Sequence, residues 1–401
     1  MKRLLFTLVF CGLLTAPAMA EDPGSFGASL GLATTSQQLT AYLNSTTSLV
    51  NAMIESYSTM PQNPIRFSGN MIYAYGTTIR QTPDDVLIAY ADALKEAGLN
   101  RIDFNPSISS LTDPAALAKY DILIAHIREI GLQIAVNPEY ELPDDAALKT
   151  LEAYRKAAVA GEAAFAARYK PDYLVVVHEP TTADERRTHS YSELSTPAQW
   201  GDFVTATATA VKAASKTTLV GAGAFVDASG REIPYFNEFV TIPDLDYVTL
   251  DNYDAEPAAI TNLDLMVQTA HGAAKPVYME ETWRPAYLPN GLPPAGVPLE
   301  KASPLGTGNA VFEPLDEIWL KAMALYCATH GLDAVTAFST PPFFLYVTSG
   351  PDSYFDAAYV REDEQALLQG KRAGTFQAYQ DLAQQLGQDA SSGNWDGRPS
   401  W

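Results

Sequence analysis

The chain alternates strand-like and helix-like segments eight times, and this alternation constrains the fold more than any other feature. The segments expected to be strands are 65–75, 100–106, 132–140, 172–180, 218–226, 245–254, 275–283 and 333–340. The helical patterns that follow them cover 82–99, 113–131, 143–169, 196–215, 231–241, 257–273, 315–331 and 361–386. Several strands are almost wholly apolar, as parallel strands buried on both faces are. Eight such units predict a single α/β domain, a (β/α)₈ barrel.

The alternative architecture is an open, doubly wound parallel sheet. That fold usually carries a glycine-rich phosphate loop after its first strand. Here the first strand is followed by AYGTTIRQTPDD, which matches neither the dinucleotide-binding nor the P-loop pattern. Gly221-Ala222-Gly223 in the fifth strand is better explained by close packing of the backbone. We therefore favour the closed barrel.

The first twenty residues have the pattern of a secretory signal peptide. Lys2 and Arg3 precede an apolar run at 4–14, and Ala18-Met19-Ala20 is a small-x-small cleavage signal. The alternative, a membrane anchor, is disfavoured because the apolar run is too short to span a bilayer. We expect cleavage after Ala20 and an exported, periplasmic or extracellular protein. The predicted divisions are a signal peptide at 1–20, a helical lead at 21–60, the barrel at 61–390 and a tail at 391–401.

The acidic composition excludes some classes of partner. The 401 residues include 26 Lys and Arg against 47 Asp and Glu, which gives a formal net charge of −21. Such a surface repels phosphate backbones and anionic membranes, so we expect no nucleic-acid partner and no membrane association after cleavage. Once the signal is removed, Cys327 is the one remaining cysteine, and it lies in an apolar helical run. The fold therefore has to be held by its core and not by a disulfide.

In a barrel of this kind, function lies at the carboxyl ends of the strands. The residues there are acidic and aromatic, which suits proton transfer to sugars and stacking on their rings. No HExxH, CxxC or GxSxG pattern is present, so neither a metal nor another cofactor is expected. The candidate site residues are Asn137, Glu139, Tyr140, His178, Glu179, Tyr253, Glu281 and Trp283.

Two glutamates are the best candidates for catalysis. Strict alternation along the strands places Glu179 on one face with Val175 and Val177, and Glu281 on one face with Val277 and Met279. The same alternation directs Glu280 towards the helices. Two carboxyl groups about 5 Å apart can hydrolyse a glycosidic bond with retention, and a separation of roughly 6.5–9.5 Å indicates inversion.

At these residues the chain resembles the glycoside hydrolase superfamily of cellulases, mannanases and β-galactanases, whose acid/base lies on strand 4 and nucleophile on strand 7. The strand-4 motif Asn-Glu-Pro is matched by His178-Glu179-Pro180, and the strand-7 motif by Glu281-Thr282-Trp283. The resemblance implies that Glu179 is the acid/base and Glu281 the nucleophile. It also implies that Tyr253, at the end of strand 6, hydrogen-bonds Glu281.

The sequence departs from the family where His178 stands in place of the usual asparagine and Asp251 in place of the usual histidine. The segment 337–344 after strand 8 also lacks the tryptophan expected there. We expect a secreted glycoside hydrolase, retaining and acting on a β-linked poly- or oligosaccharide. The expected substrate contacts are His178, Tyr253, Trp283, Glu139, Tyr140 and Asn137. One alternative is a barrel that binds or transglycosylates carbohydrate, for example in exopolysaccharide handling. Another is a metal-dependent hydrolase, which the lack of a histidine cluster disfavours. The sequence predicts no oligomeric state.

Overall fold

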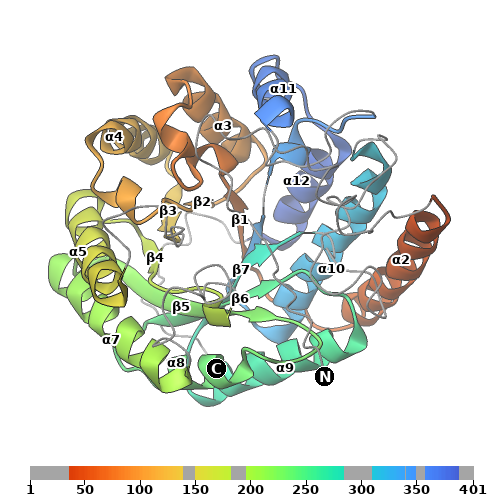
Figure 1. Ribbon diagram of the computed structural model, residues 1–401. Coiled ribbons are helices and arrows are strands. Elements are labelled where there is room, and N and C mark those ends of the chain that lie inside the picture. The colour runs from red at the N-terminus through yellow and green to blue at the C-terminus, as the bar shows by residue number, and fades with distance from the viewer. Residues whose placement is uncertain are drawn as a thin grey trace, which may run out of the picture.

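The computed structural model describes residues 36–138, 150–181, 196–283, 309–338, 340–348 and 357–387. Eight parallel strands form a closed barrel in chain order, with β8 paired to β1 (Figure 1). The predicted barrel is therefore confirmed. The strands are β1 Arg66–Asn70, β2 Arg101–Phe104, β3 Gln133–Val136, β4 Tyr173–Val175, β5 Leu219–Val226, β6 Tyr247–Asn252, β7 Val277–Thr282 and β8 Ala334–Ala337.

Helices surround the barrel (Figure 1). Those in the described part of the chain are α2 Ser36–Ser58, α3 Asp84–Glu96, α4 Pro114–Glu129, α5 Leu151–Tyr169, α7 Pro197–Ala214, α8 Ile233–Phe239, α9 Pro257–Gly272, α10 Glu313–His330, α11 Ala357–Leu368 and α12 Gly374–Leu386. The lead helix α2 lies beside α10, where the rings of Tyr57 and Tyr326 meet edge to face 5.5 Å apart. None of the described helices is long and apolar enough to cross a membrane.

The helix boundaries follow from local sequence signals. Asp113 precedes Pro114 and accepts a hydrogen bond from the backbone N–H of Ala116, which starts α4. Thr196 and Gln199 form a reciprocal capping box at the start of α7. These side chains satisfy N–H groups that a helix leaves without partners in its first turn.

The structure corrects two predicted boundaries, and a third lies partly outside the described residues. The strand expected over 65–75 ends at Asn70, and the chain continues as a short 3₁₀ turn. The helix expected over 361–386 is two helices, because Gly370 takes a left-handed backbone (φ +72°) after α11 and breaks the run before α12 begins. The helix expected from 143 is described from Leu151, where Thr150 caps it; the earlier residues lie outside the described part.

The barrel interior is polar and aromatic and differs from the apolar layer between strands and helices. The rings of Tyr173, Tyr247 and Tyr278 meet inside the barrel, 4.6–5.8 Å apart. A side chain at Gly221 would collide with the ring of Tyr247, and one at Gly223 with Thr249. The glycines of β5 therefore make room for the residues of β6, which confirms the packing role expected for Gly221-Ala222-Gly223.

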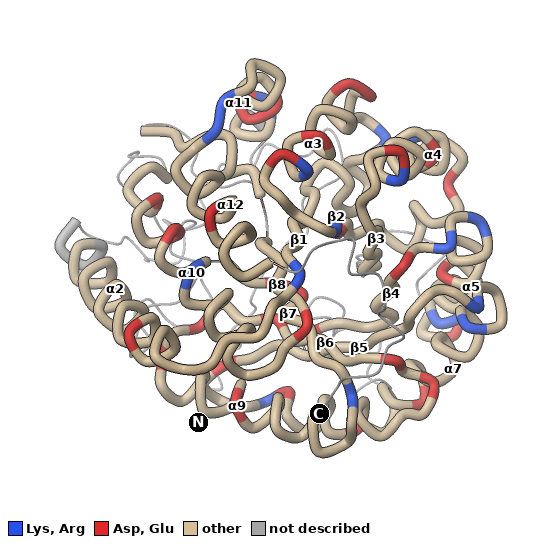
Figure 2. The backbone as a smooth tube through the Cα atoms, turned by 180° about the vertical axis from the view of Figure 1, so that it is seen from behind, with Lys and Arg blue, Asp and Glu red and all other residues tan. Residues whose placement is uncertain are grey.

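Acidic residues occupy the helices all around the barrel (Figure 2), in keeping with the net charge of −21. Cys327 is fully buried on α10, and burial raises the pKa of its thiol. It is thus a packing residue, as the sequence predicts.

Candidate active site

The last residues of β7 break the alternation on which the sequence prediction depends. Tyr278 and Glu280 face the barrel interior, whereas Val277 and Met279 pack in the apolar layer under the helices. The register of β7 then shifts against both neighbouring strands, so that Glu281 pairs with Asp251 of β6. The irregularity turns Glu281 inward directly after Glu280. The expectation that Glu281 shares a face with Val277 and Met279 is therefore wrong.

The sequence prediction for Glu280 is also wrong. It does not face the helices but accepts a hydrogen bond from Arg101 at 3.1 Å inside the barrel. Arg101 also pairs with Asp103 at 3.2 Å, and all three side chains are almost fully buried. Burial raises the pKa of Asp103 well above its usual range, against the opposing effect of Arg101. A buried ionic layer therefore lies within the barrel, on the strands that carry the site.

Both carboxylate oxygens of Glu281 accept hydrogen bonds. The Tyr253 hydroxyl donates to Oε2 at 2.7 Å, and the Asn105 Nδ2 donates to Oε1 at 3.3 Å. Asn105 itself accepts a hydrogen bond from Asn70. Glu281 is 4% exposed, and hydrogen bonds donated to a buried carboxylate favour its ionised form.

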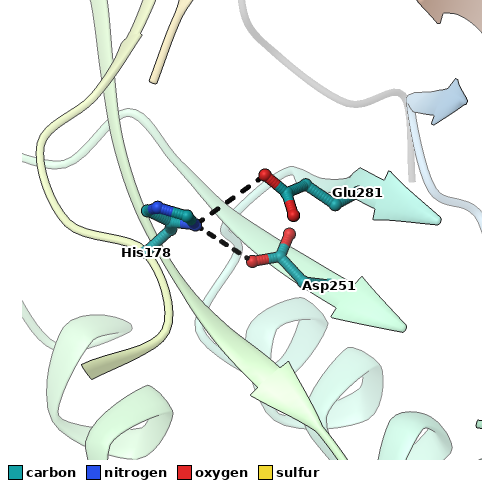
Figure 3. A group of neighbouring side chains, drawn as sticks. All are labelled: His178, Asp251 and Glu281. Atoms are coloured by element: carbon teal, nitrogen blue, oxygen red, sulfur yellow. Dashed lines mark ion pairs between the residues drawn. The ribbon is translucent and has the colours of Figure 1, made fainter. Parts of the chain in front are cut away.

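His178 faces two carboxylates at the barrel mouth. Its Nδ1 is 3.5 Å from Oδ2 of Asp251 and 4.0 Å from Oε1 of Glu281 (Figure 3). Asp251 is fully buried, and burial raises its pKa to about 7; His178 opposes this shift, and the charge of Glu179 adds to it. The two residues that depart from the family motif are thus in contact with each other.

The same three side chains are the group in the described part of the chain whose geometry could hold a metal ion. One ligand atom each from His178, Asp251 and Glu281 lies within 4.8 Å of the others. One imidazole and two carboxylates suit a borderline cation such as Zn²⁺. However, Asn105 and Tyr253 already donate hydrogen bonds to both oxygens of Glu281. A protonated His178 would also supply positive charge beside the two carboxylates, in place of a metal ion.

Glu179 is placed at the barrel mouth by a different backbone conformation from that of Glu281. The strand β4 ends at Val175, and Val177 packs in the apolar layer, so the predicted shared face of Val175, Val177 and Glu179 is wrong. Glu179 is 7% exposed and has a positive φ of 43°, which is rare for a residue other than glycine. Its charge acts on Asp251, beside Glu281, and on Glu232.

Glu232 is a buried carboxylate that the sequence analysis missed. It precedes α8 and is 1% exposed. Its Oε1 accepts hydrogen bonds from both the backbone N–H and the hydroxyl of Thr181, and its Oε2 accepts one from the backbone N–H of Phe225 at 2.6 Å. Inspection of the loop after strand 5, and not only of strand ends, would have found it, because that loop opens on the same rim.

The remaining predicted site residues are placed as follows. Asn137 is buried directly after β3. Trp283 is 2% exposed and packs against Phe343, with ring centroids 5.8 Å apart, so its ring is enclosed by protein. Tyr253 stacks on Phe225 and meets Phe338, which follows β8 and was not among the predicted residues. Glu139 and Tyr140 lie outside the described residues.

Comparisons with known proteins add evidence on the fold. No protein-family model and no curated protein sequence matches the chain. A solved exo-β-1,4-mannosidase from Opitutaceae bacterium strain TAV5 is similar with a TM-score of 0.57 and 13% identity, over 82% of this chain and 61% of that one. This chain therefore matches less than two thirds of that enzyme's length.

Two further solved structures are similar at lower scores. They are an endo-1,4-β-mannanase from Rhizomucor miehei (TM-score 0.47, 13% identity, 77% of this chain and 98% of that one) and a double mutant of the Cellulomonas fimi endo-β-1,4-mannanase (TM-score 0.49, 13% identity, 87% and 76%). At such identities the mannosidase likeness shows the fold. The chain has the (β/α)₈ barrel architecture found in glycoside hydrolases, as the sequence resemblance predicts.

Proposed function

We propose that the protein is a retaining glycoside hydrolase that cleaves β-linked glycans, with Glu281 as nucleophile and Glu179 as acid/base. The observation that carries the proposal is the burial and hydrogen bonding of Glu281. It is a buried carboxylate at the barrel mouth that accepts hydrogen bonds from Tyr253 and Asn105, and the second buried glutamate, Glu179, acts electrostatically on its neighbour Asp251.

The two carboxyl groups would divide the reaction between them. The protonated Glu179 donates its proton to the leaving glycosidic oxygen, while a carboxylate oxygen of Glu281 attacks the anomeric carbon and forms a covalent glycosyl ester. The ionised Glu179 then takes a proton from water, whose oxygen attacks the same carbon and releases Glu281. The hydrogen bonds from Tyr253 and Asn105 orient Glu281 for both steps.

β-Mannosides are the first substrates to test, because one similar structure, with a TM-score of 0.57, is named as an exo-β-1,4-mannosidase. The aromatic rings of Tyr253, Phe225 and Phe338 beside Glu281 support a sugar as the ligand. The N-terminal signal pattern supports an exported enzyme that acts on glycans outside the cytoplasm.

The test is the replacement of each glutamate by its neutral isostere. We expect Glu281→Gln and Glu179→Gln each to lower kcat on the cleaved glycan by about 10³-fold or more. Glu129→Gln, a change on the exposed face of α4, should leave kcat unchanged. NMR of the first-formed sugar should show retention of the anomeric configuration.

Three other results would contradict the proposal. Full activity in both glutamine variants would exclude the pair. Loss of activity on chelation would favour a metal-dependent hydrolase at His178, Asp251 and Glu281. Glycan binding without any released product would favour the carbohydrate-binding or transglycosylating barrel.

A further inference from the structure

A third glutamate, Glu232, connects the ends of two neighbouring strands at the barrel mouth. Its carboxylate receives two hydrogen bonds from Thr181, which follows β4, and one from the backbone of Phe225 in β5. Thr181 is two residues after Glu179. The one buried side chain therefore holds the segment that carries Glu179 against the neighbouring strand.

The backbone of Glu179 needs such support. A non-glycine residue at positive φ is strained, and such a conformation persists only where the surroundings impose it. Pro180 adds to the strain, since a residue before proline prefers an extended conformation. The chain before Glu179 is fixed by the hydrogen bond from the Gly223 N–H to the Val177 carbonyl, and the chain after it by Glu232.

The chemistry of the contact explains why a carboxylate is present. Both oxygens of Glu232 face donors, and a glutamine would turn an NH₂ group towards either Thr181 or Phe225. The placement is unfavourable in other respects. Burial, and then the charge of Glu179, raises the pKa of Glu232 to about 8. The hydrogen bonds from Thr181 and Phe225 oppose this shift, so the contacts with the loop are what stabilises the ionised form of Glu232.

We propose that Glu232 is a positioning residue for the acid/base: by holding Thr181 it fixes the backbone of Glu179 and keeps that carboxyl group aimed at the leaving oxygen. This inference rests on the proposed role of Glu179. It predicts a defect limited to the step in which Glu179 donates its proton.

The experiment compares two substrates that differ in their need for a proton. Phenyl β-mannoside has a poor leaving group and needs general acid catalysis, whereas 2,4-dinitrophenyl β-mannoside departs without it. We expect Glu232→Gln to lower kcat/KM about 10- to 100-fold for the phenyl substrate and less than about 3-fold for the dinitrophenyl substrate. Glu238→Gln, on the same side of the barrel in α8, is the matched control and should change neither.

Thr181→Val provides a milder variant if Glu232→Gln does not fold, because it removes only the hydroxyl hydrogen bond to Glu232. It should shift the ratio of the two kcat/KM values in the same direction. Equal losses of kcat/KM on both substrates would mean that Glu232 has only a general structural role. Unchanged kcat/KM on both would mean that Glu232 has no role in catalysis. Either result would overturn the inference.

A crystal structure of Glu232→Gln tests the positioning without depending on the substrate. We expect Glu179 to leave its positive φ or its carboxyl group to turn away from Asp251. An unchanged Glu179 would overturn the positioning role even if the sugar specificity is not that of a mannosidase. Retained activity in Glu179→Gln would instead refute the proposed function, so the two failures are distinguishable.

Discussion

The ends of β7 and β4 each carry a buried glutamate, but they hold it in opposite ways. At the end of β7 a register shift turns Glu281 inward, and side chains from other segments, Tyr253 and Asn105, donate hydrogen bonds to both of its oxygens. At the end of β4 the strand stops early, and Glu179 is placed by a positive φ. No described residue donates a hydrogen bond to its carboxyl group; the support is given to its backbone through Thr181 and Glu232.

This difference fits the two roles proposed for the carboxyl groups. A nucleophile has to remain ionised and fixed relative to the anomeric carbon, which donors to its oxygens achieve. An acid/base has to give up and regain a proton within each cycle, so permanent donors to its oxygens would hold it in the ionised form. Fixing the backbone orients such a group without settling its protonation state.

The largest effect expected from this comparison is the loss of kcat when a side-chain contact of Glu281 is removed. Tyr253→Phe removes the hydroxyl that donates to Oε2, and we expect kcat to fall about 100-fold with little change in the free energy of unfolding. Tyr379→Phe is the contrasting variant, because that hydroxyl donates to backbone carbonyls of Ser68 and Val335 outside the site. It should cost about 1 kcal/mol of stability and leave kcat unchanged. Equal kcat in the two variants would mean that the hydrogen bond from Tyr253 does not hold Glu281 for catalysis. The proposed difference between the ends of β7 and β4 would then be lost.

The next effect is on the pH dependence of stability, since each strand end buries one carboxyl group beside its glutamate. Burial raises the pKa of Asp251 from 3.8 to about 7 and that of Glu232 from 4.5 to about 8. Below the lower value of each pair the folded and unfolded states are both protonated, and the stabilisation is complete. As the pH rises towards the folded value, only the unfolded state ionises. Each group then lowers the free energy of unfolding by at most about 1.4 kcal/mol per pH unit.

Urea unfolding between pH 4 and pH 9 checks this dependence. Asp251→Asn should flatten the slope between about pH 4 and 7, and Glu232→Gln should flatten it up to about pH 8. Between pH 7 and 8 only the Glu232 variant should differ in slope from the wild type. The same slope in both variants and the wild type would show that neither carboxyl group is kept protonated by the fold.

The sequence predicts the barrel well because the repeated strand–helix pattern is redundant. An error at one boundary, such as the missed break at Gly370, leaves the remaining seven units and the closure intact. The prediction of the site is less complete. The residues near the mouth were identified by type and position, but the faces of β4 and β7 were inferred from strict alternation, and alternation fails at both ends.

The reasons for that failure are physical and local. A register shift in β7 depends on how three strands fit together, and the residues of β7 alone do not announce it. The positive φ of Glu179 is equally hidden, because glycine or asparagine usually marks such a position. Glu232 was missed because its hydrogen-bond partners, Thr181 and Phe225, come together only when β4 and β5 pair.

The smallest expected effect separates the two strand ends by backbone conformation alone. At Glu179 the positive φ favours glycine over alanine, so Glu179→Gly should be about 1 kcal/mol more stable than Glu179→Ala. Glu281 has no positive φ and lies within β7, where the freedom of glycine is a cost. There the order should reverse, with Glu281→Gly about 0.5–1 kcal/mol less stable than Glu281→Ala. Urea unfolding of the four variants measures both differences, and because all four lack the carboxyl group in question, the comparison is independent of catalysis. The same order at both positions would mean that Glu179 is not held at positive φ in solution, and the backbone support assigned to Glu232 would lose its purpose.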